Sequence, residues 1–540
     1  MSISNSLRNV SESVLNYDTI IIGGKNMRLK HLKRLLSAAL IVGVLATSVP
    51  VMTSNVYASG DIHDYSYCEE YVIGESILYY KINDDTTITI HGYHGDEGTL
   101  IIPDEIDGKK VTTIWCDCFE ENLINITIPK SVKQIEGGAF RDATNLKNIN
   151  VNADNADYIS KDGVLFNKGM TSLDCYPVKK SGSSYTIPES VTTIGFYAFS
   201  GCTGLTNITF TESITKIEPG AFSYCTGLTN IRLPESITEF GDRAFQGCTG
   251  LTNITLSESI TEIGWYTFKD CTELKSITIP KFVKYISYGA FVNCSGLTNI
   301  NVDEDNMHYM SKDGVLYNKS MTSLKCYPAS KTGISYVIPD SIQYIEPYAF
   351  SGCTELESVN IPDSIQHIGE CSFSGCTGLS NIKIPESITK INCDTFKGCM
   401  GLTNITLPET ITLIEGGAFE NCRGLTSVTI LGTNVDIYYR AFEGIPNLTL
   451  YGYKNSGVDS YANAHDIKFR IIGETVVGDL DGDGNINSTD AVAIQKYLAG
   501  NVIEGFTKES ADLNGDGEVN SADSVLLMKY LAGYEVKLGN

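Results

Sequence analysis

The stretch that decides the fold reads Ile194-Gly195-Phe196-Tyr197-Ala198-Phe199-Ser200-Gly201-Cys202-Thr203-Gly204-Leu205. Its Phe-x-x-Cys-x-x-Leu core returns every 23 residues. The phenylalanines are Phe199, Phe222, Phe245, Phe268 and Phe291, then Phe350, Phe373, Phe396, Phe419 and Phe442, and the cysteines are Cys202, Cys225, Cys248, Cys271, Cys294, Cys353, Cys376, Cys399 and Cys422. A repeat this short cannot bury an apolar core alone, so neighbouring units must stack. The sequence therefore predicts a solenoid over most of the chain.

Each repeat contains two short apolar segments. In the unit that starts at Leu228, the apolar residues are Leu228, Ile231 and Leu233, and the end of the segment alternates between apolar and polar residues. Pro234 ends this segment because proline cannot donate a hydrogen bond to a strand ladder. A second apolar pair, Ile237 and Phe240, follows before the turn that closes the unit. Each unit is therefore predicted to be two short strands and a turn.

The repeated unit resembles the bacterial leucine-rich repeats of the BspA-like surface-antigen class. The resemblance covers roughly residues 95–450, where the unit recurs again and again. It implies a mainly β solenoid of short parallel strands, on a secreted or surface protein that binds other molecules. It does not imply an enzyme.

Composition narrows the classes of partner. The chain has 540 residues and a formal net charge of −24. Outside the first 58 residues it contains no basic block and no interleaving of basic and aromatic residues. Nucleic acid is therefore an unfavourable partner.

The first 58 residues read as a leader. Basic residues between Arg28 and Arg34 precede an apolar run, Leu35–Met52, which Pro50 interrupts, and Val56-Tyr57-Ala58 supplies small residues for signal peptidase. We expect residues 1–58 to be a leader with a signal peptide, Met27 to be the true start, and the mature chain to be secreted without a membrane span. A single membrane anchor is the alternative.

The rest of the chain divides into three parts. Residues 59–119 are expected to form an N-terminal cap, because the terminal unit of a solenoid must cover an apolar end. Residues 120–472 are expected to form the repeat array and its C-terminal cap, with a short helix near Ser460–His465. Residues 475–540 differ in composition and are expected to form a separate module.

Two intervals break the 23-residue period. The extra segments, near residues 150–182 and 301–333, match each other at a spacing of 151 residues, which indicates an internal duplication. Each contains Asp-Gly between apolar runs, at Asp162-Gly163 and Asp313-Gly314, a strong signal for a β-hairpin. We expect the two hairpins to be additions to the solenoid that do not break it.

The cysteine pattern favours packing over disulfides. Nine of the 16 cysteines share one repeat position, so stacking should place them in a buried column as small apolar residues. Side chains that point the same way oppose disulfide geometry, so we expect reduced thiols there. A disulfide between Cys371 and Cys393, which lie on neighbouring units, is an alternative for this pair. No Cys-x-x-Cys pair supports a cysteine metal site.

Two acidic loops 33 residues apart point to calcium. Each is a twelve-residue loop with oxygen donors at positions 1, 3, 5, 9 and 12, a glycine at position 6 and a backbone carbonyl at position 7. Ca²⁺ takes several oxygen ligands from a flexible loop of this spacing. The candidate ligands of two ions are Asp479, Asp481, Asp483, Asn485, Asn487 and Asp490 in the first loop, and Asp512, Asn514, Asp516, Glu518, Asn520 and Asp523 in the second.

These loops depart from the EF-hand. Position 12 is Asp, no helix is expected before the loop, and an amphipathic helix follows each loop, Ala491–Leu498 and Ser524–Leu531. Residues 475–535 closely resemble a dockerin, which we class as type I. The resemblance implies a small α-helical domain that folds with calcium and binds a cohesin module on the scaffolding protein of a cellulosome.

The dockerin resemblance also implies which residues contact cohesin. The first set is Ser488, Thr489, Gln495 and Lys496, and the set related by the internal two-fold repeat is Ser521, Ala522, Met528 and Lys529. Ala522 stands where the first set has Thr489, so we expect the two faces to bind unequally.

The solenoid carries no recognised catalytic motif. Its carboxylates fall mostly at one repeat position, such as Glu189, Glu212, Glu235 and Glu258, which fits a solvated ladder. Aromatic residues concentrate before the Ala-Phe pair, and stacking would align them as one ridge that either binds a protein or polysaccharide or covers the edge of the core. The ridge residues are Phe196, Tyr197, Trp265, Tyr266, Tyr288, Tyr348 and Tyr439.

These features predict a secreted, non-catalytic binding or adhesion subunit of a cellulosome. One alternative is a subunit that degrades polysaccharide, with glycoside hydrolase activity in the repeats or inserts, because paired carboxylates serve that chemistry. The other is a structural spacer or inhibitor.

Overall fold

The computed structural model describes residues 19–22, 25–28, 65, 67–95, 98–472, 477–480, 486–501, 503 and 506–539. It divides into two compact units, Met1–Asp64 and Tyr65–Asn540. In the first unit, β1 (Thr19–Ile22) pairs antiparallel with β2 (Lys25–Arg28). Apart from its first two residues, the expected signal peptide, residues 27–58, lies outside the described residues. Among those residues, no helix is both long enough and apolar enough to span a membrane.

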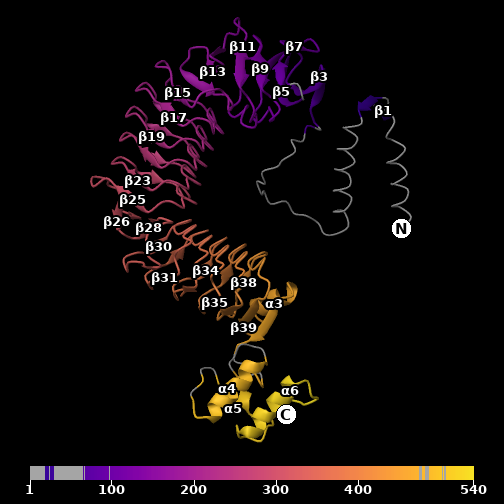
Figure 1. The fold of residues 1–540 in the computed structure, drawn as a ribbon, viewed down its shortest axis with the longest axis vertical. Helices are drawn as coiled ribbons and strands as arrows, with labels where there is room; N and C mark the ends of the chain where they lie inside the picture. Colours follow the sequence, from indigo (N-terminus) through magenta and orange to yellow (C-terminus); the bar gives the residue numbers. More distant parts are fainter. Residues whose placement is uncertain are drawn as a thin grey trace. The chain divides into compact units, whose positions relative to one another are not determined.

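The second unit contains a β-solenoid of about 17 turns, as the repeat period predicted. Each rung has a first strand and a shorter second strand, shown by β19 (Asn230–Arg232) and β20 (Glu239–Phe240). β19 pairs in parallel with β21 (Asn253–Thr255), and Asn230 lies opposite Asn253, one repeat later. Equivalent residues therefore lie opposite each other in neighbouring rungs. Successive strands follow one another along the array, as from β15 through β17 to β19 in Figure 1.

The remaining strands continue the two series. The other first strands are β6 (Thr99–Ile101), β9 (Asn125–Ile128), β11 (Asn148–Val151), β15 (Ser184–Thr186), β17 (Asn207–Thr209), β23 (Ser276–Ile279), β25 (Asn299–Val302), β29 (Ser335–Val337), β31 (Ser358–Asn360), β33 (Asn381–Ile382), β35 (Asn404–Leu407), β37 (Ser427–Ile430) and β39 (Thr449–Gly452). The other second strands are β8 (Lys109–Ile114), β10 (Gln134–Ile135), β14 (Ser172–Cys175), β16 (Thr193–Ile194), β18 (Lys216–Ile217), β22 (Glu262–Ile263), β24 (Tyr285–Ile286), β28 (Ser323–Cys326), β30 (Tyr344–Ile345), β32 (His367–Ile368), β34 (Lys390–Ile391), β36 (Leu413–Ile414) and β38 (Asp436–Ile437).

The repeat phenylalanines form the spine of the core. Phe222 stacks on Phe199 with ring centroids 5.1 Å apart and on Phe245 at 5.2 Å. The same stacking runs from Phe350 through Phe373 at 4.9 Å and onward. Offset ring pairs add to the free energy of burial, so each rung is stabilised by its neighbours.

The repeat cysteines form a second buried column. Cys225 donates its thiol hydrogen to the carbonyl of Phe199 at 2.9 Å, and Cys248 bonds Phe222 in the same way at 3.1 Å. All 16 cysteines are free thiols. Cys371 and Cys393 are also unbridged, and they meet through a backbone hydrogen bond of 3.0 Å.

The inserts contain the predicted hairpins. β12 (Tyr158–Lys161) pairs antiparallel with β13 (Val164–Asn167), and β26 (Tyr309–Lys312) pairs likewise with β27 (Val315–Asn318). In each, the hairpin leads back into the solenoid, because β14 and β28 pair in parallel with the second strand of the next rung.

The solenoid of about 17 turns continues past both inserts, as expected, although its second-strand sheet is interrupted at each of them. The sheet that contains β10 ends there, and the next second-strand sheet begins with β12. The hydroxyl of Tyr158 instead accepts the N–H of Ile135 at 2.9 Å, and Tyr309 accepts that of Ile286 at 3.0 Å. The hairpin occupies the hydrogen-bonding edge that the next rung would otherwise use.

Tyr176 and Tyr327 occupy the phenylalanine position of the rungs that leave the inserts. Tyr176 lies 23 residues before Phe199 and stacks on it at 5.2 Å, and Tyr327 stacks on Phe350 at the same distance. Cys202 lies against the carbonyl of Tyr176, as other repeat cysteines do against phenylalanine carbonyls. The aromatic column therefore resumes within each insert.

Both ends of the array are capped. At the N-terminal end, β3 (Glu69–Ile73), β4 (Ser76–Ile82) and β5 (Thr87–His94) form an antiparallel sheet, and β5 pairs in parallel with β8, which β7 (Glu105–Ile106) also joins. At the other end the predicted helix is α3 (Gly457–Ala464), and β40 (Lys468–Ile471) pairs with β39. Rung strands begin at β6, before the boundary expected at residue 120.

The C-terminal module has its own small core. Its helices are α4 (Ser488–Leu498), α5 (Lys508–Ala511) and α6 (Ser521–Leu531). Six buried apolar residues, including Leu480, Ile494 and Leu527, form a cluster separate from those of the solenoid. The expectation that no helix precedes the loops is wrong for the second loop, which follows α5 directly.

Candidate functional site

The second calcium loop is held by its own carboxylates. Asp512 accepts backbone N–H groups from Asp516 at 3.0 Å and Gly517 at 2.6 Å. The carboxylate of Asp523, which is fully buried, accepts from Leu513 at 2.8 Å and Asn520 at 2.9 Å. These bonds curl the loop around Asp512 and close its end against α6.

The end of each loop is also the start of a helix. Asn520 caps α6 and Asp523 returns a bond to the cap, and Asn487 and Asp490 form the same capping box on α4. A capping box satisfies backbone donors that a helix start leaves open. Both helices therefore begin three residues earlier than expected. Asp481, Asp483 and Asn485 of the first loop lie outside the described residues.

The chemistry of the second loop fits calcium. Each carboxylate oxygen of Asp512 keeps a further lone pair after one backbone hydrogen bond, and Asn514 and the Glu518 carbonyl add neutral oxygens. The fully buried carboxylate of Asp523 is stabilised by three backbone N–H donors, those of Leu513, Asn514 and Asn520. Among the described residues, no three acidic, histidine or cysteine side chains converge on one point.

The two helices present matching exposed faces. Val492 and Leu498 of α4 are exposed, as are their equivalents Val525 and Leu531 on α6. Each face also carries an exposed lysine, and the candidate cohesin contacts Ser488, Thr489, Gln495, Lys496, Ser521, Ala522, Met528 and Lys529 are all exposed. The sequence did not mark these valines and leucines as a binding surface, because apolar residues repeated along a helix usually form its buried face.

The two faces differ at one contact. The amide of Gln495 donates to the hydroxyl of Ser524 at 2.5 Å, which ties α4 to α6. The equivalent positions on the other side are Met528 and Ala491, which lack the groups for such a bond. Gln495 is therefore partly committed to the helix interface, whereas Met528 is free to meet a partner.

The seven aromatic residues of the expected ridge lie in three groups. Trp265, Tyr266, Tyr288 and Tyr348 form one group of edge-to-face ring contacts, with the hydroxyls of Tyr266 and Tyr348 2.9 Å apart. Phe196 and Tyr197 lie three rungs earlier, and Tyr439 lies at the end of the array beside His465. Rungs with Pro219-Gly220 or Gly416-Gly417 separate the groups, so the expected ridge is not continuous.

The residue two positions before each phenylalanine has a left-handed backbone. Its φ is 54° at Tyr197, 67° at Gly220, 56° at Arg243 and 54° at Tyr266. An added Cβ on Gly220 would meet the ring of Tyr197 at 2.3 Å, so this ring covers the next rung. Tyrosines at this position therefore cover the edge of the core, while the residue before them, such as Phe196 or Trp265, is exposed.

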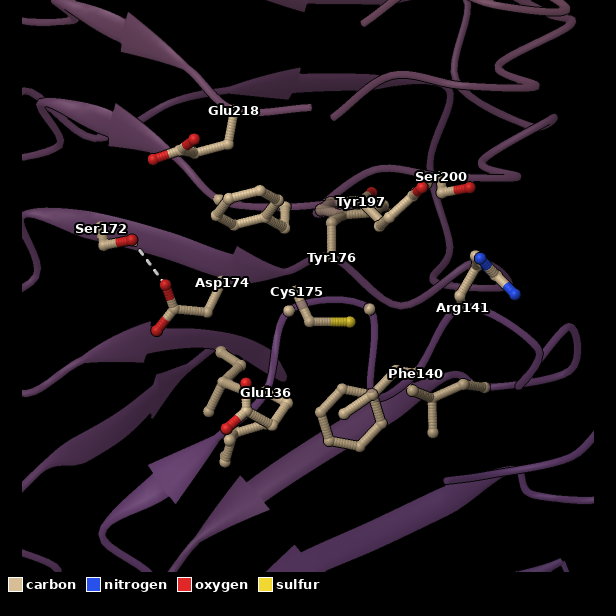
Figure 2. Close-up of a pocket in the computed structure, with 18 of the residues that line it drawn as sticks. Glu136, Phe140, Arg141, Ser172, Asp174, Cys175, Tyr176, Tyr197, Ser200 and Glu218 are labelled. Carbon is tan, nitrogen blue, oxygen red and sulfur yellow. Dashed lines mark hydrogen bonds between the residues drawn. The ribbon is translucent and has the colours of Figure 1, made fainter. Parts of the chain in front are cut away.

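A cavity of about 170 Å³ opens at the first insert (Figure 2). It lies between the rung of Phe140 and the rungs of Tyr176 and Phe199. Its acidic lining is Glu136, Asp174 and Glu218. Burial raises the pKa of Asp174 to about 6, and the Ser172 hydroxyl donates to its carboxylate. Sequence reasoning did not single out this site.

The repeat carboxylates are exposed, as a solvated ladder requires. Glu189, Glu212, Glu235 and Glu258 all face solvent. The Glu235 carboxylate accepts the N–H of Glu258 at 2.8 Å, so one rung's acid caps the turn of the next. These side chains serve the turns of the solenoid.

Comparison with known families assigns the array. The profile described as "BspA type Leucine rich repeat region (6 copies)" matches residues 102–174, 170–298 and 323–449, more than half of the chain. The chain belongs to the BspA-type leucine-rich repeat family. The dockerin type I domain matches residues 477–532, so this leucine-rich repeat protein carries a dockerin at its C-terminal end.

Two bacterial proteins of known structure are similar to this leucine-rich repeat protein. A leucine-rich cell surface protein of Faecalibacterium prausnitzii is 30% identical, over 73% of this chain and 97% of that one, with a TM-score of 0.49. The pneumococcal vaccine antigen PcpA is 20% identical, over 76% and 99%, with a TM-score of 0.46. No curated protein matches the chain.

The two families define the general character of the molecule. The repeat array is a leucine-rich repeat solenoid, and the module that follows it is a type I dockerin. Dockerin type I domains bind calcium and take cohesin modules as partners.

Proposed function

We propose that this protein is a secreted, non-catalytic binding subunit of a cellulosome. Its dockerin, residues 475–540, anchors it to a cohesin module, and its repeat array presents a recognition surface. The observation that carries the proposal is the pair of loop-and-helix halves, in which the same capping box follows each acidic loop. Residues 1–58 act as the leader, so the mature chain is expected to begin at Ser59, which N-terminal sequencing of the secreted protein checks.

Two calcium ions complete the dockerin. Asp512, Asn514, Asp516, Asn520 and Asp523 supply side-chain oxygens to one ion and Glu518 supplies its carbonyl. Asp479, Asp481, Asp483, Asn485, Asn487 and Asp490 supply the same positions for the other. The apolar cluster of this module is small, so the ions contribute a large share of its folding free energy.

Cohesin binding then uses one helix face at a time. The face on α6 offers exposed Val525, Met528 and Leu531 around Lys529. The face on α4 offers Val492 and Leu498, with Gln495 engaged by Ser524. Exposed apolar side chains beside a charge are typical of a docking surface. The α6 face is therefore expected to bind more tightly.

Capture on an immobilised type I cohesin tests the proposal. The full chain is expected to bind in millimolar calcium and to elute with excess EGTA. Met528→Asp with Val525→Asp should weaken capture more than the matched pair Gln495→Asp with Val492→Asp. Capture that survives excess chelator, or that neither pair weakens, would contradict the anchoring role.

A further inference from the structure

The internal duplication gives the first-insert cavity a built-in comparison. We call the two copies of the duplicated sequence the first block, which contains the insert near residues 150–182, and the second block, which contains the insert near residues 301–333. Residues 151 positions apart are equivalent, so Asp174 corresponds to Lys325 and Gly195 to Glu346. The strand that carries Asp174, β14, and the strand that carries Lys325, β28, pair with their neighbours in the same register. Differences between the two sites therefore come from side chains.

In the second block the chain fills this site with its own cation. The ammonium of Lys325 pairs with Glu346 at 3.1 Å and lies 5.7 Å from the ring centroid of Tyr288. The Ser323 hydroxyl donates to the same carboxylate. The space that remains is about 20 Å³, close to the size of one water.

In the first block every one of those filling groups is missing. Lys325 is replaced by Asp174, Glu346 by Gly195 and Tyr288 by Gly137, and the cavity grows to about 170 Å³. The carboxylate stays, now on β14 and bonded by Ser172, the equivalent of Ser323. The site in the first block therefore keeps a carboxylate and a hydroxyl, but it lacks the ammonium that neutralises the carboxylate in the second block.

The other charges at the cavity are already engaged. Glu218 pairs with Lys216 at 3.1 Å, and Glu136 accepts the amide of Gln134 at 2.6 Å. Arg141 pairs with Asp117 at 3.2 Å and lies across the lining from Asp174 (Figure 2). None of the described residues forms an ion pair with Asp174. Carbon atoms of buried Phe140 and half-buried Tyr197 line the remaining wall.

We propose that this cavity binds the primary ammonium group of an alkylamine, with the Asp174 carboxylate as its ion-pair partner and aromatic carbon around its alkyl chain. The ligand takes the place that the Lys325 side chain occupies in the second block. A lysine side chain of another protein and a free diamine share this chemistry. An ammonium beside a carboxylate and an aromatic ring is favourable in a partly desolvated site.

Saturation-transfer difference NMR on the full chain tests the proposal with n-butylammonium as the probe. Saturable transfer to its methylene protons is expected, and neutral n-butanol should give at least about tenfold weaker binding, because a charge-assisted hydrogen bond is lost. Asp174→Asn should weaken n-butylammonium binding by a similar factor. Equal binding of both probes, or unchanged binding by Asp174→Asn, would overturn the proposal.

A second variant separates loss of the site from loss of the fold. Asp174→Lys with Gly195→Glu installs the pair of the second block, where Glu346 stands on the same strand register. An added Cβ on Gly195 would lie 3.0 Å from the Leu173 carbonyl oxygen and 3.5 Å from the carboxylate that Asp174→Lys removes. This variant should stay folded by circular dichroism and lose the probe. Lys325→Met should leave binding unchanged. Tighter binding of Nα-acetyl-lysine amide would identify a lysine side chain as the ligand, and tighter binding of 1,5-diaminopentane would identify a free diamine. If neither compound binds and the probe does not bind either, the cavity holds only water and the proposal is wrong.

Discussion

At the scale of single residues, the repeat cysteines act as small apolar side chains with one weak donor. Cys225 is fully buried, and its thiol hydrogen is used by the Phe199 carbonyl. Burial raises the pKa of Cys225 and Cys248 well above the ordinary value. The thiolate, which is the reactive form, is therefore suppressed along the column.

Alkylation should separate the column from the surface thiols. In native protein at pH 8, iodoacetamide is expected to modify exposed Cys393 and to spare all nine column cysteines, which should react only in denaturant. Peptide mass spectrometry after short treatment measures this. Native modification of Cys225 or Cys248 would show that the rungs open locally.

Asp174 should make stability depend on pH in an unusual direction for a carboxylate. Its pKa is raised to about 6, so the folded state binds this proton more tightly than the unfolded state does. The group therefore stabilises the fold as pH falls from about 6 toward 4 and destabilises it above that range. Asp174→Asn is expected to raise the free energy of unfolding by about 1–2 kcal/mol at pH 7.5 and by almost nothing near pH 4.

Urea unfolding at the two pH values measures this difference. The engaged acids Glu136 and Glu218 remain in the variant, so their contributions cancel in the comparison. An equal gain at both pH values would mean that the substitution acts through packing.

At the scale of elements, the rung that leaves each insert depends on one tyrosine. Tyr176 is almost fully buried between Phe199, stacked at 5.2 Å, and Tyr185, in edge contact at 4.9 Å. Tyr176→Ala should lower the free energy of unfolding by about 3–5 kcal/mol through loss of a buried ring. Tyr176→Phe restores the repeat residue and should cost less than about 1 kcal/mol.

Thermal unfolding monitored by circular dichroism compares the two variants. The duplicated residue provides a matched pair, since Tyr327→Ala and Tyr327→Phe should follow the same order. A large loss from Tyr176→Phe would show that its hydroxyl has a structural role.

The sequence predicted the rung well because its apolar positions recur without change. The phenylalanine column, the strand pairs and the hairpins all follow from that period. Tyr176 was not predicted to belong to this column because its Cys-Tyr-Pro sequence lacks the Ala-Phe signature, although it lies 23 residues before Phe199. The left-handed backbone two residues before each phenylalanine was not predicted either, because Tyr197, Gly220 and Arg243 share a positive φ but no side-chain property.

The sequence suggests a site where the candidate ligands lie close together in the chain, and it marks none where the lining residues are far apart. The loop from Asp512 to Asp523 is readable because its donors follow one spacing. The cavity at Asp174 depends on what stands at Gly137 and Gly195, on other rungs, so no local pattern marks it. The duplicated block supplies the one available signal, the change from Lys325 to Asp174.

At the scale of the whole molecule, the apolar core is divided into separate clusters, and we expect these clusters to unfold as separate cooperative units. The array contains three clusters that meet at the inserts, where Leu165 belongs to one and Val164 to the next. The second boundary lies between Leu316 and Val315. The dockerin cluster around Ile494 is separate from all three. Solenoid stability is a sum of rung and interface terms, so a perturbation stays near its origin.

Hydrogen exchange with and without EGTA should reveal this independence. Chelation is expected to abolish amide protection in α4 and α6, because the ions hold both loops against their capping boxes. Protection of the array between β6 and β39 should not change. Asp512→Ala with Asp523→Ala should reproduce the chelator effect in millimolar calcium, while Glu235→Ala, an exposed acid of the repeat ladder, serves as the control. Loss of protection in the array on chelation would mean that calcium also stabilises the repeats, and the dockerin would then be part of the solenoid's cooperative unit instead of an anchor attached to it.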